Sequence, residues 1–207
     1  MAGSGKRRKK RSANGAAAGG KTPESGGFRW KYAVYGACGV ALVAGAYGYY
    51  NSQVKASTFE DLAMAGQASL SQVAVSPSEG RTHVPVGQPL QFATNPPTSG
   101  AHYPVWVDPG FYENAQSQVN LVHSLEHGMI VVYYDKPDAA VLDRLREWAG
   151  LFSGPWSGII AVPRAGLDEK LILTAWRRTL RMDRFEESAA AAFIDAFRGR
   201  GPENPVR

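Results

Sequence analysis

The stretch LVHSLEHGMIVVYY, residues Leu121–Tyr134, combines two of the chain's four histidines with its clearest β-strand pattern. Five of the six residues from 129 to 134 are β-branched or aromatic, which predicts a buried strand. The residues before them place Leu121 and Leu125 four apart and end at Gly128. This pattern is typical of a short helical turn that a glycine terminates before the strand begins.

His123 and His127 lie four residues apart within this stretch, and Glu126 lies between them. On a helix, side chains four residues apart share one face and lie about 6 Å apart, close enough to bind one metal ion. On a strand, the same spacing separates them by about 13 Å, which is too far. The helical interpretation favours a metal site or a catalytic pair. A hydrogen-bonded buried pair is the structural alternative.

The residues on both sides of this stretch predict a small α+β domain. The upstream chain is dense in Pro, Gly, Thr and Ser, which predicts loop with short strands such as Leu90–Ala93. The elements expected downstream are a helix over Asp138–Trp148, strands over Gly158–Val162 and Leu171–Trp176, and a helix over Asp183–Arg198. This order indicates a two-layer domain over residues 73–200. In it, a short antiparallel or mixed sheet packs with two helices and a long Pro/Gly-rich loop region.

The N-terminal part of the chain predicts a membrane anchor. Residues 1–28 are strongly basic and low in complexity, so we expect a disordered tail. The segment Tyr32–Tyr50 holds 19 residues without a charge and has tyrosines near both ends, which predicts a transmembrane helix over residues 30–50. A cleaved signal peptide is the alternative. Residues 51–72 are then expected to form a polar stalk.

The charge distribution suggests an orientation and argues against one class of partner. Residues 1–31 carry nine Lys or Arg and one acid, whereas the rest of the chain has 14 basic and 17 acidic residues. The positive-inside rule then predicts a single-pass protein of the cell membrane with a cytoplasmic N-terminus and an extracytoplasmic C-terminal domain. Because the folded part is mildly acidic, we expect no nucleic-acid partner. The single cysteine, Cys38, excludes an intramolecular disulfide and a cysteine-based zinc cluster.

The other two histidines, His83 and His102, lie in the segments GRTHVPVG and PPTSGAHYP. A lone histidine in such a loop is usually exposed or makes an ordinary hydrogen bond. All four histidines of the chain, however, lie between His83 and His127. This clustering of a scarce residue type favours a shared metal site over four unrelated roles.

The string His123-Ser-Leu-Glu126-His127 also fits the H-x-x-E-H pattern of the inverzincin peptidases. In those enzymes two histidines hold zinc, the glutamate is the general base, and a downstream carboxylate completes the ligands. Three later glutamates lie near the body of the predicted domain: Glu169, Glu186 and Glu187. The last two are expected on the solvated face of a helix, so the sequence offers no convincing third ligand.

The segments NPPTSGAHYP and LVHSLEHGMIVVYY together resemble an uncharacterised bacterial family, domain of unknown function 3105. The resemblance extends from GRTHVPVG through LTAW to the last helix and covers most of the predicted extracytoplasmic domain. Members often carry one N-terminal membrane span. The family pattern is matched at His83, Pro96, Pro97, Ser99, Gly100, His102, His123, Glu126, His127 and Gly128. The resemblance supplies no activity, but it implies that the four histidines and Glu126 belong to one shared feature.

Three functions compete on this basis. The first is a membrane-anchored extracytoplasmic domain that binds a transition metal, copper or zinc, through His83, His102, His123, His127 and Glu126, because imidazoles suit both ions. The second is a zinc-dependent hydrolase in which three of the histidines hold the ion (His102, His123 and His127) and Glu126 is the base. The third is a non-metal envelope scaffold or interaction module, in which the histidines form a hydrogen-bonded network. The sequence indicates no particular protein partner.

Neighbouring residues have expected roles in the metal-binding interpretation. The PPTSG segment is expected to be a stiff loop that presents the histidine after it, with Thr98 or Ser99 hydrogen-bonding nearby. Tyr103 and Trp106 are expected to form walls of the site. Met129 is a candidate soft ligand for copper(I), although a methionine that opens a strand is more typical of a core.

Overall fold

The computed structural model describes residues 27–167 and 171–207, which divide between two compact units, Met1–Ala46 and Tyr47–Arg207. Most of the tail that we expected to be disordered, residues 1–26, lies outside the described residues. The first helix, α1 (Gly27–Ala65), contributes to both units. The second unit carries every residue of the predicted metal site.

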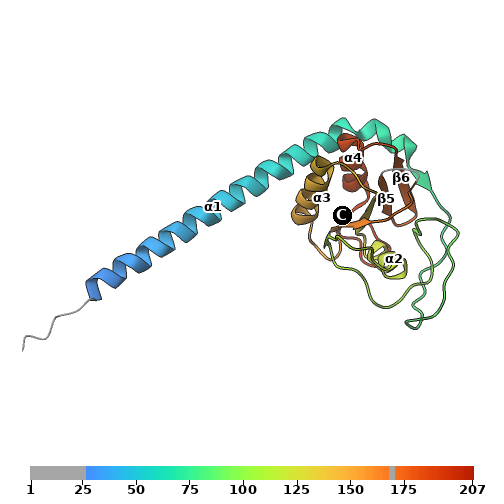
Figure 1. Cartoon of the computed structure of the whole chain (residues 1–207), viewed down its shortest axis with the longest axis horizontal. Helices are drawn as coiled ribbons and strands as arrows, with labels where there is room; N and C mark the ends of the chain where they lie inside the picture. Colours follow the sequence, from blue (N-terminus) through green and yellow to red (C-terminus); the bar gives the residue numbers. More distant parts are fainter. Residues whose placement is uncertain (1–26, 168–170) are drawn as a thin grey trace, which may run out of the picture. The chain divides into compact units, whose positions relative to one another are not determined.

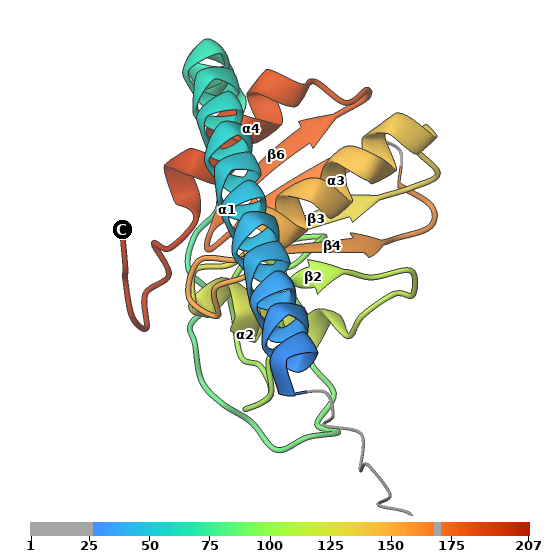
Figure 2. The ribbon, with the colours of Figure 1, turned by 90° about the vertical axis from the view of Figure 1, so that its left-hand side faces the viewer.

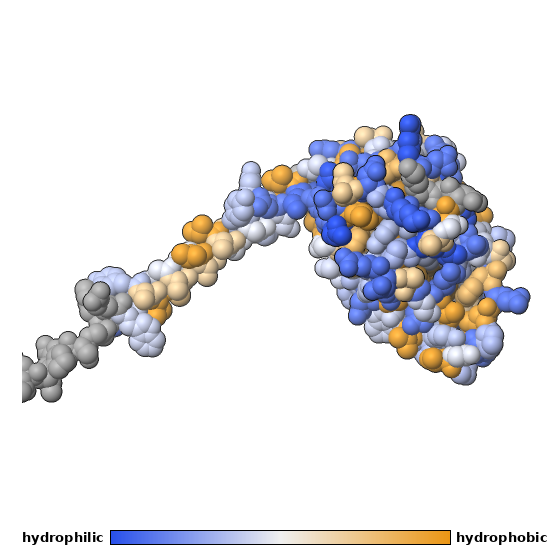
Figure 3. Space-filling view, in the orientation of Figure 1, coloured by the Kyte–Doolittle hydropathy of each residue, from blue (hydrophilic) through white to orange (hydrophobic). Residues whose placement is uncertain are grey.

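The prediction of a transmembrane helix over residues 30–50 is wrong. No helix in the described part of the chain combines the length and the apolar character needed to cross a membrane. The reason is that a segment without charges is not thereby strongly apolar. Of the 19 residues in Tyr32–Tyr50, five are Tyr, five Ala and four Gly, and only four are Val or Leu, the types that insert favourably. In Figure 3 the aliphatic residues of this helix are accordingly interrupted by paler ones.

The core of the second unit is a six-stranded mixed sheet with strand order β1-β6-β5-β3-β4-β2. Figure 2 shows several of these strands side by side. The central strand β3 runs parallel to β4 and antiparallel to β5. The strands are β1 (Ala74–Val75), β2 (Gly110–Phe111), β3 (Ile130–Tyr134), β4 (Ile159–Pro163), β5 (Leu171–Ala175) and β6 (Arg178–Met182).

Helices cover both faces of this sheet, since residues of β3 point alternately to two apolar clusters. Ile130, Val132 and Tyr134 belong to the cluster that packs on α3, α4 and the end of α1, whereas Val131 and Tyr133 belong to the cluster on α2. Figure 1 shows α3 and α4 on one side of the sheet and α2 on the other. The helices are η1 (Gln67–Gln72), α2 (Gln118–Glu126), α3 (Ala139–Leu151) and α4 (Glu187–Phe197). Burying each large side chain of β3 stabilises the fold by about 1.5–3 kcal/mol.

The sheet and helices fit the predicted α+β class, but the predicted two layers are three, because α2 packs on the second face of the sheet. The central strand, the two downstream strands and both later helices are confirmed. The short strand expected at Leu90–Ala93 is absent from the structure. Strand β6 was not predicted, because its sequence RTLRM contains two arginines and shows no regular alternation of polar and apolar residues. Residues 51–72, expected as a stalk, form the end of α1 and η1. They place Phe59 in the core, 5.4 Å from the ring of Trp148.

Candidate metal centre

Helix α2 places His123 and His127 on one face, as the spacing predicted. His127 is the C-terminal cap of the helix, and its backbone N–H donates to the carbonyl of His123 at 3.1 Å. The two imidazole rings have centroids 4.7 Å apart. Gly128 then reverses the chain with φ +99, where a Cβ atom would lie 2.7 Å from the nitrogen of Gly201. The helix can therefore end at this point only with a glycine, since an L-residue is strained at such a φ and has no room here.

Ser124 fastens α2 to the loop that precedes β2. Its hydroxyl donates to the carbonyl of Val107 and accepts from the N–H of Val107, both at 2.9 Å. The serine is fully buried. This pairing holds the backbone of Tyr103 near the helix, where its carbonyl accepts a hydrogen bond from Nδ1 of His123 at 2.9 Å.

Two loop segments bring His83 and His102 beside each other. The two residues form a parallel β-bridge, in which the N–H of His102 donates to Thr82 and the N–H of Val84 donates to His102. Ser99 is fully buried and accepts from the N–H of Glu79 at 3.0 Å. The PPTSG segment is thus tied to the segment before His83 by side-chain and backbone bonds.

The hydrogen bonds of the rings determine which nitrogen carries the proton. Nδ1 of His102 contacts the carbonyl oxygen of Gly100 at 2.8 Å, and Nδ1 of His123 contacts that of Tyr103. Because a carbonyl oxygen only accepts, both Nδ1 atoms must carry hydrogen. In the neutral rings the lone pair is then on Nε2. This is the usual arrangement of metal-binding histidines, whose second nitrogen donates to a fixed acceptor.

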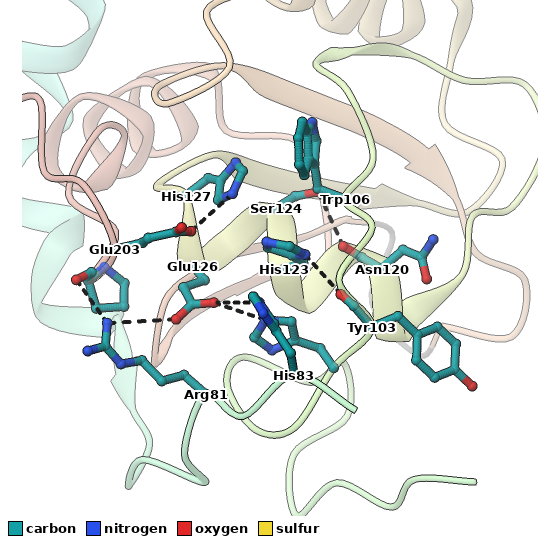
Figure 4. A network of polar contacts seen from close by, with 12 residues as sticks. Arg81, His83, Tyr103, Trp106, Asn120, His123, Ser124, Glu126, His127 and Glu203 are labelled. Carbon is teal, nitrogen blue, oxygen red and sulfur yellow. Dashed lines mark hydrogen bonds and ion pairs between the residues drawn. The ribbon is translucent and has the colours of Figure 1, made fainter. Parts of the chain in front are cut away.

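Three imidazoles and one carboxylate converge at this point. The rings of His83, His102 and His123 form a nearly equilateral triangle with centroid separations of 4.9, 4.7 and 4.8 Å. Glu126 Oε2 lies 2.9 Å from Nε2 of His102 and 3.8 Å from Nε2 of His83. One nitrogen from each of the three rings and one Glu126 oxygen lie within 4.8 Å of one another. Figure 4 shows Glu126 between Arg81 and the imidazoles.

The short contact between His102 and Glu126 is not a well-formed hydrogen bond. Although the atoms are 2.9 Å apart, Nε2 of His102 is buried and has no hydrogen-bond partner of acceptable geometry among the described residues. His102 is fully buried and Glu126 is 4% exposed, so water does not solvate this pair freely. When the His102 ring is neutral, its Nε2 lone pair and the carboxylate oxygen of Glu126 are two acceptor atoms facing each other in a buried environment.

Burial keeps the helical histidines in the neutral, ligand-competent form. Burial, together with repulsion by the three other histidines, lowers the pKa of His123 to about 4, although the hydrogen bond to the Tyr103 carbonyl opposes this shift. Burial also lowers the pKa of His127, which the nearby Glu203 carboxylate opposes. Both rings are therefore neutral imidazoles rather than imidazolium ions at neutral pH.

His127 belongs to a second, overlapping group. Its Nε2 lies 3.0 Å from Glu203 Oε2, and its ring stacks on Trp156 at 4.2 Å and lies 4.8 Å from Trp106. One nitrogen of His123, one of His127 and one Glu203 oxygen lie within 4.8 Å of one another. The structure therefore gathers His83, His102, His123 and Glu126 in one group, and His127 with Glu203 and His123 in another.

Sequence reasoning missed Glu203 and Arg81. Glu203 follows the last helix in the segment GPENPVR, whose prolines gave the only hint of order. Of the glutamates considered instead, Glu187 opens α4 and Glu186 is its N-cap, and neither belongs to either group. Glu169 lies outside the described residues. Among the expected wall residues, Trp106 lies 5.6 Å from His123, ring to ring. Met129 is fully buried in the apolar cluster on α2, which makes it a core residue.

Comparison with known proteins gives a family but no relative of known activity. Neither the curated proteins nor the solved structures contain a match to this chain. The family model described as protein of unknown function (DUF3105) matches residues 83–207. That range begins at His83 and includes the other three histidines, Glu126 and Glu203. The chain therefore belongs to the DUF3105 family.

Proposed function

We propose that this domain binds one transition-metal ion, zinc or copper, through His83, His102, His123 and Glu126. The observation that carries the proposal is the contact between Nε2 of His102 and Oε2 of Glu126, two acceptor atoms 2.9 Å apart without a well-formed hydrogen bond. Buried acceptors that face each other repel, so something positive must lie between them.

A metal ion satisfies this requirement better than a proton. A proton bridges two atoms only when it lies close to the line between them, and the pair is not aligned in that way. An ion bound about 2.0–2.1 Å from each ligand instead holds tetrahedral ligands about 3.3 Å apart. The 2.9 Å contact is near this value, and Nε2 of the exposed His83 ring lies 3.8 Å from the same Glu126 oxygen.

The donor set favours zinc or copper. Three imidazole nitrogens are borderline ligands, and a set of three imidazoles with one carboxylate oxygen and no thiolate suits zinc and copper(II) better than calcium or magnesium. Glu126 in this set acts as a ligand, so the geometry leaves the hydrolase interpretation without its general base. Metal binding is therefore the function that the arrangement supports best.

Metal analysis of the purified full-length chain tests this proposal. We expect about one zinc or copper ion per chain by elemental mass spectrometry after dialysis against a weak chelator, and near-complete loss in Glu126→Gln and His102→Gln. Glu113→Gln is the matched control, because Glu113 is an exposed carboxylate in neither group. A wild-type chain that stays metal-free after incubation with both ions contradicts the proposal and favours a hydrogen-bonded scaffold.

A further inference from the structure

His127 and Glu203 of the second group take no part in the proposed four-ligand site, although the two groups share His123. Its carboxylate comes from the C-terminal segment that follows α4, and Figure 4 shows Glu203 directed at His127. The side chain of Glu203 is 40% exposed, against 5% for Glu126. Trp106 and Trp156 contact the ring of His127. The group thus combines one surface carboxylate with two buried imidazoles.

The C-terminal segment is fixed where it delivers Glu203. The N–H of Gly199 donates to the carbonyl of Gly128 at 2.7 Å, and the carbonyl of Pro202 accepts from Arg81 at 3.2 Å. A Cβ atom on Gly201 would lie 2.1 Å from the carbonyl oxygen of Glu126, so only glycine allows so close an approach. The backbone therefore brings Glu203 to the end of α2 by contacts that do not depend on its carboxylate.

The two groups cannot both hold an ion with all their ligands. They share His123, whose Nδ1 is hydrogen-bonded to the Tyr103 carbonyl. Only its Nε2 remains to bind a metal, and one imidazole nitrogen binds one ion. The two groups are therefore alternative positions for the same ion, and His123 is the ligand common to both.

We propose that His127 and Glu203, with His123, form a loading position that first captures the metal ion and passes it to the four-ligand site. The ion keeps His123 while it exchanges Glu203 and His127 for His83, His102 and Glu126. This inference rests on the proposed function. The direction follows from ligand number, since four protein ligands hold an ion more tightly than three.

Charge supports this route over direct arrival at the four-ligand site. On the side of Glu126, the guanidinium of Arg81 is 59% exposed and lies 3.8 Å from Oε1 of Glu126. A fixed positive charge there repels an approaching cation. The exposed carboxylate of Glu203 attracts one instead.

Rapid mixing of the metal-free full-length chain with Co²⁺ tests the proposal, with tryptophan fluorescence reporting arrival because two indoles contact His127. We expect Glu203→Gln to slow loading about tenfold, on the scale that a local charge changes on-rates. Its final stoichiometry should stay at one ion per chain, with little change in final affinity. Gln still accepts a hydrogen bond from His127, so the segment should stay in place. Arg81→Gln added to Glu203→Gln should restore part of the rate, and Glu113→Gln is the matched control.

Each other outcome has a definite meaning. If Glu203→Gln loads as fast as the wild type, no loading position exists. If Glu203→Gln loses as much final affinity as Glu126→Gln, Glu203 is a permanent ligand and the proposed transfer is wrong. Uptake of two ions by the wild type contradicts the sharing of His123. A wild type that binds no metal fails at the earlier step, the proposed function itself.

Discussion

The two groups of ligands differ in how firmly the fold holds them. In the four-ligand group, carbonyl oxygens fix the rings of His102 and His123, and three of the four side chains are buried. In the other group, Glu203 is exposed and extends from the last residues of the chain. The difference teaches that preorganisation adds to ligand number in distinguishing the proposed four-ligand site from the proposed loading position.

The largest expected effect on metal affinity comes from the loss of a ligand whose ring is fixed by a hydrogen bond. We expect His102→Gln to weaken metal affinity by about a hundredfold or more, since loss of a partner in the outer shell alone costs about 10–100-fold. The same change at His127 should weaken final affinity less than tenfold, because this ring is outside the four-ligand group. Competition with a chromophoric chelator measures both. Equal losses of metal affinity in the two variants would show that His127 is as important for final metal binding as His102, contrary to the proposed difference between the two groups.

A backbone change at the end of α2 should disturb both groups at once. Gly128→Ala adds a Cβ atom 2.7 Å from the nitrogen of Gly201 at a residue with φ +99. We expect the free energy of unfolding to fall by about 2–3 kcal/mol, measured by urea denaturation. Gly166→Ala is the control, since its φ is +75 and no atom lies within 4 Å of its Cβ position. Equal losses in the two variants would mean that the contact with the C-terminal segment adds nothing.

Removing the hydroxyl of Ser124, which fastens α2 to the preceding loop, should reduce stability and metal affinity by a smaller amount. Ser124→Ala removes the pairing with the N–H and carbonyl of Val107 and leaves both buried groups unsatisfied. We expect a loss of about 1–3 kcal/mol in unfolding free energy. We also expect roughly tenfold weaker metal binding, because the Tyr103 carbonyl no longer fixes His123 firmly. Unchanged metal affinity in a destabilised Ser124→Ala variant would show that this serine stabilises the fold without fixing the position of His123 for metal binding.

A different kind of effect is a dependence of stability on pH in the metal-free chain. The folded-state pKa of His123 is about 4, below the ordinary value of 6.5, so the unfolded chain binds the proton first. Stability should therefore fall as pH drops through 6.5, and this contribution should level off below about pH 4. Comparing the pH dependence of the thermal unfolding of the wild type with that of His123→Gln isolates the contribution of His123. A wild-type profile identical to that of the variant between pH 7 and pH 4 would contradict the neutral, buried state of His123.

The fold around β3 and the helical turn before it were predictable from local pattern. The run from Met129 to Tyr134 and the spacing of His123 and His127 are signals within one turn or one strand, and Gly128 marks where they meet. The grouping of His83 with His102 depended on the family resemblance, because their bridge joins two irregular segments that have no periodicity.

Two features were beyond local pattern. Glu203 reaches the site only because the backbone of the C-terminal segment packs against the end of α2, a contact between residues far apart in the sequence. The wrong prediction of a membrane span at Tyr32–Tyr50 had a different cause. The absence of charged residues was read as a sign of a membrane-spanning helix, whereas the content of strongly apolar residues such as Val and Leu decides whether a helix can span a membrane. In contrast, the five residues of β3 are aliphatic or aromatic and are all buried.

X-ray absorption at the metal edge of the loaded full-length chain tests the central claim most directly. A site made by His83, His102, His123 and Glu126 predicts three imidazole nitrogens and one carboxylate oxygen about 2.0–2.1 Å from zinc, with no sulfur. Glu126→Gln should lose this pattern and Glu113→Gln should keep it. A shell of water oxygens without the outer scattering of imidazole rings, or one containing sulfur, would contradict the four-ligand site.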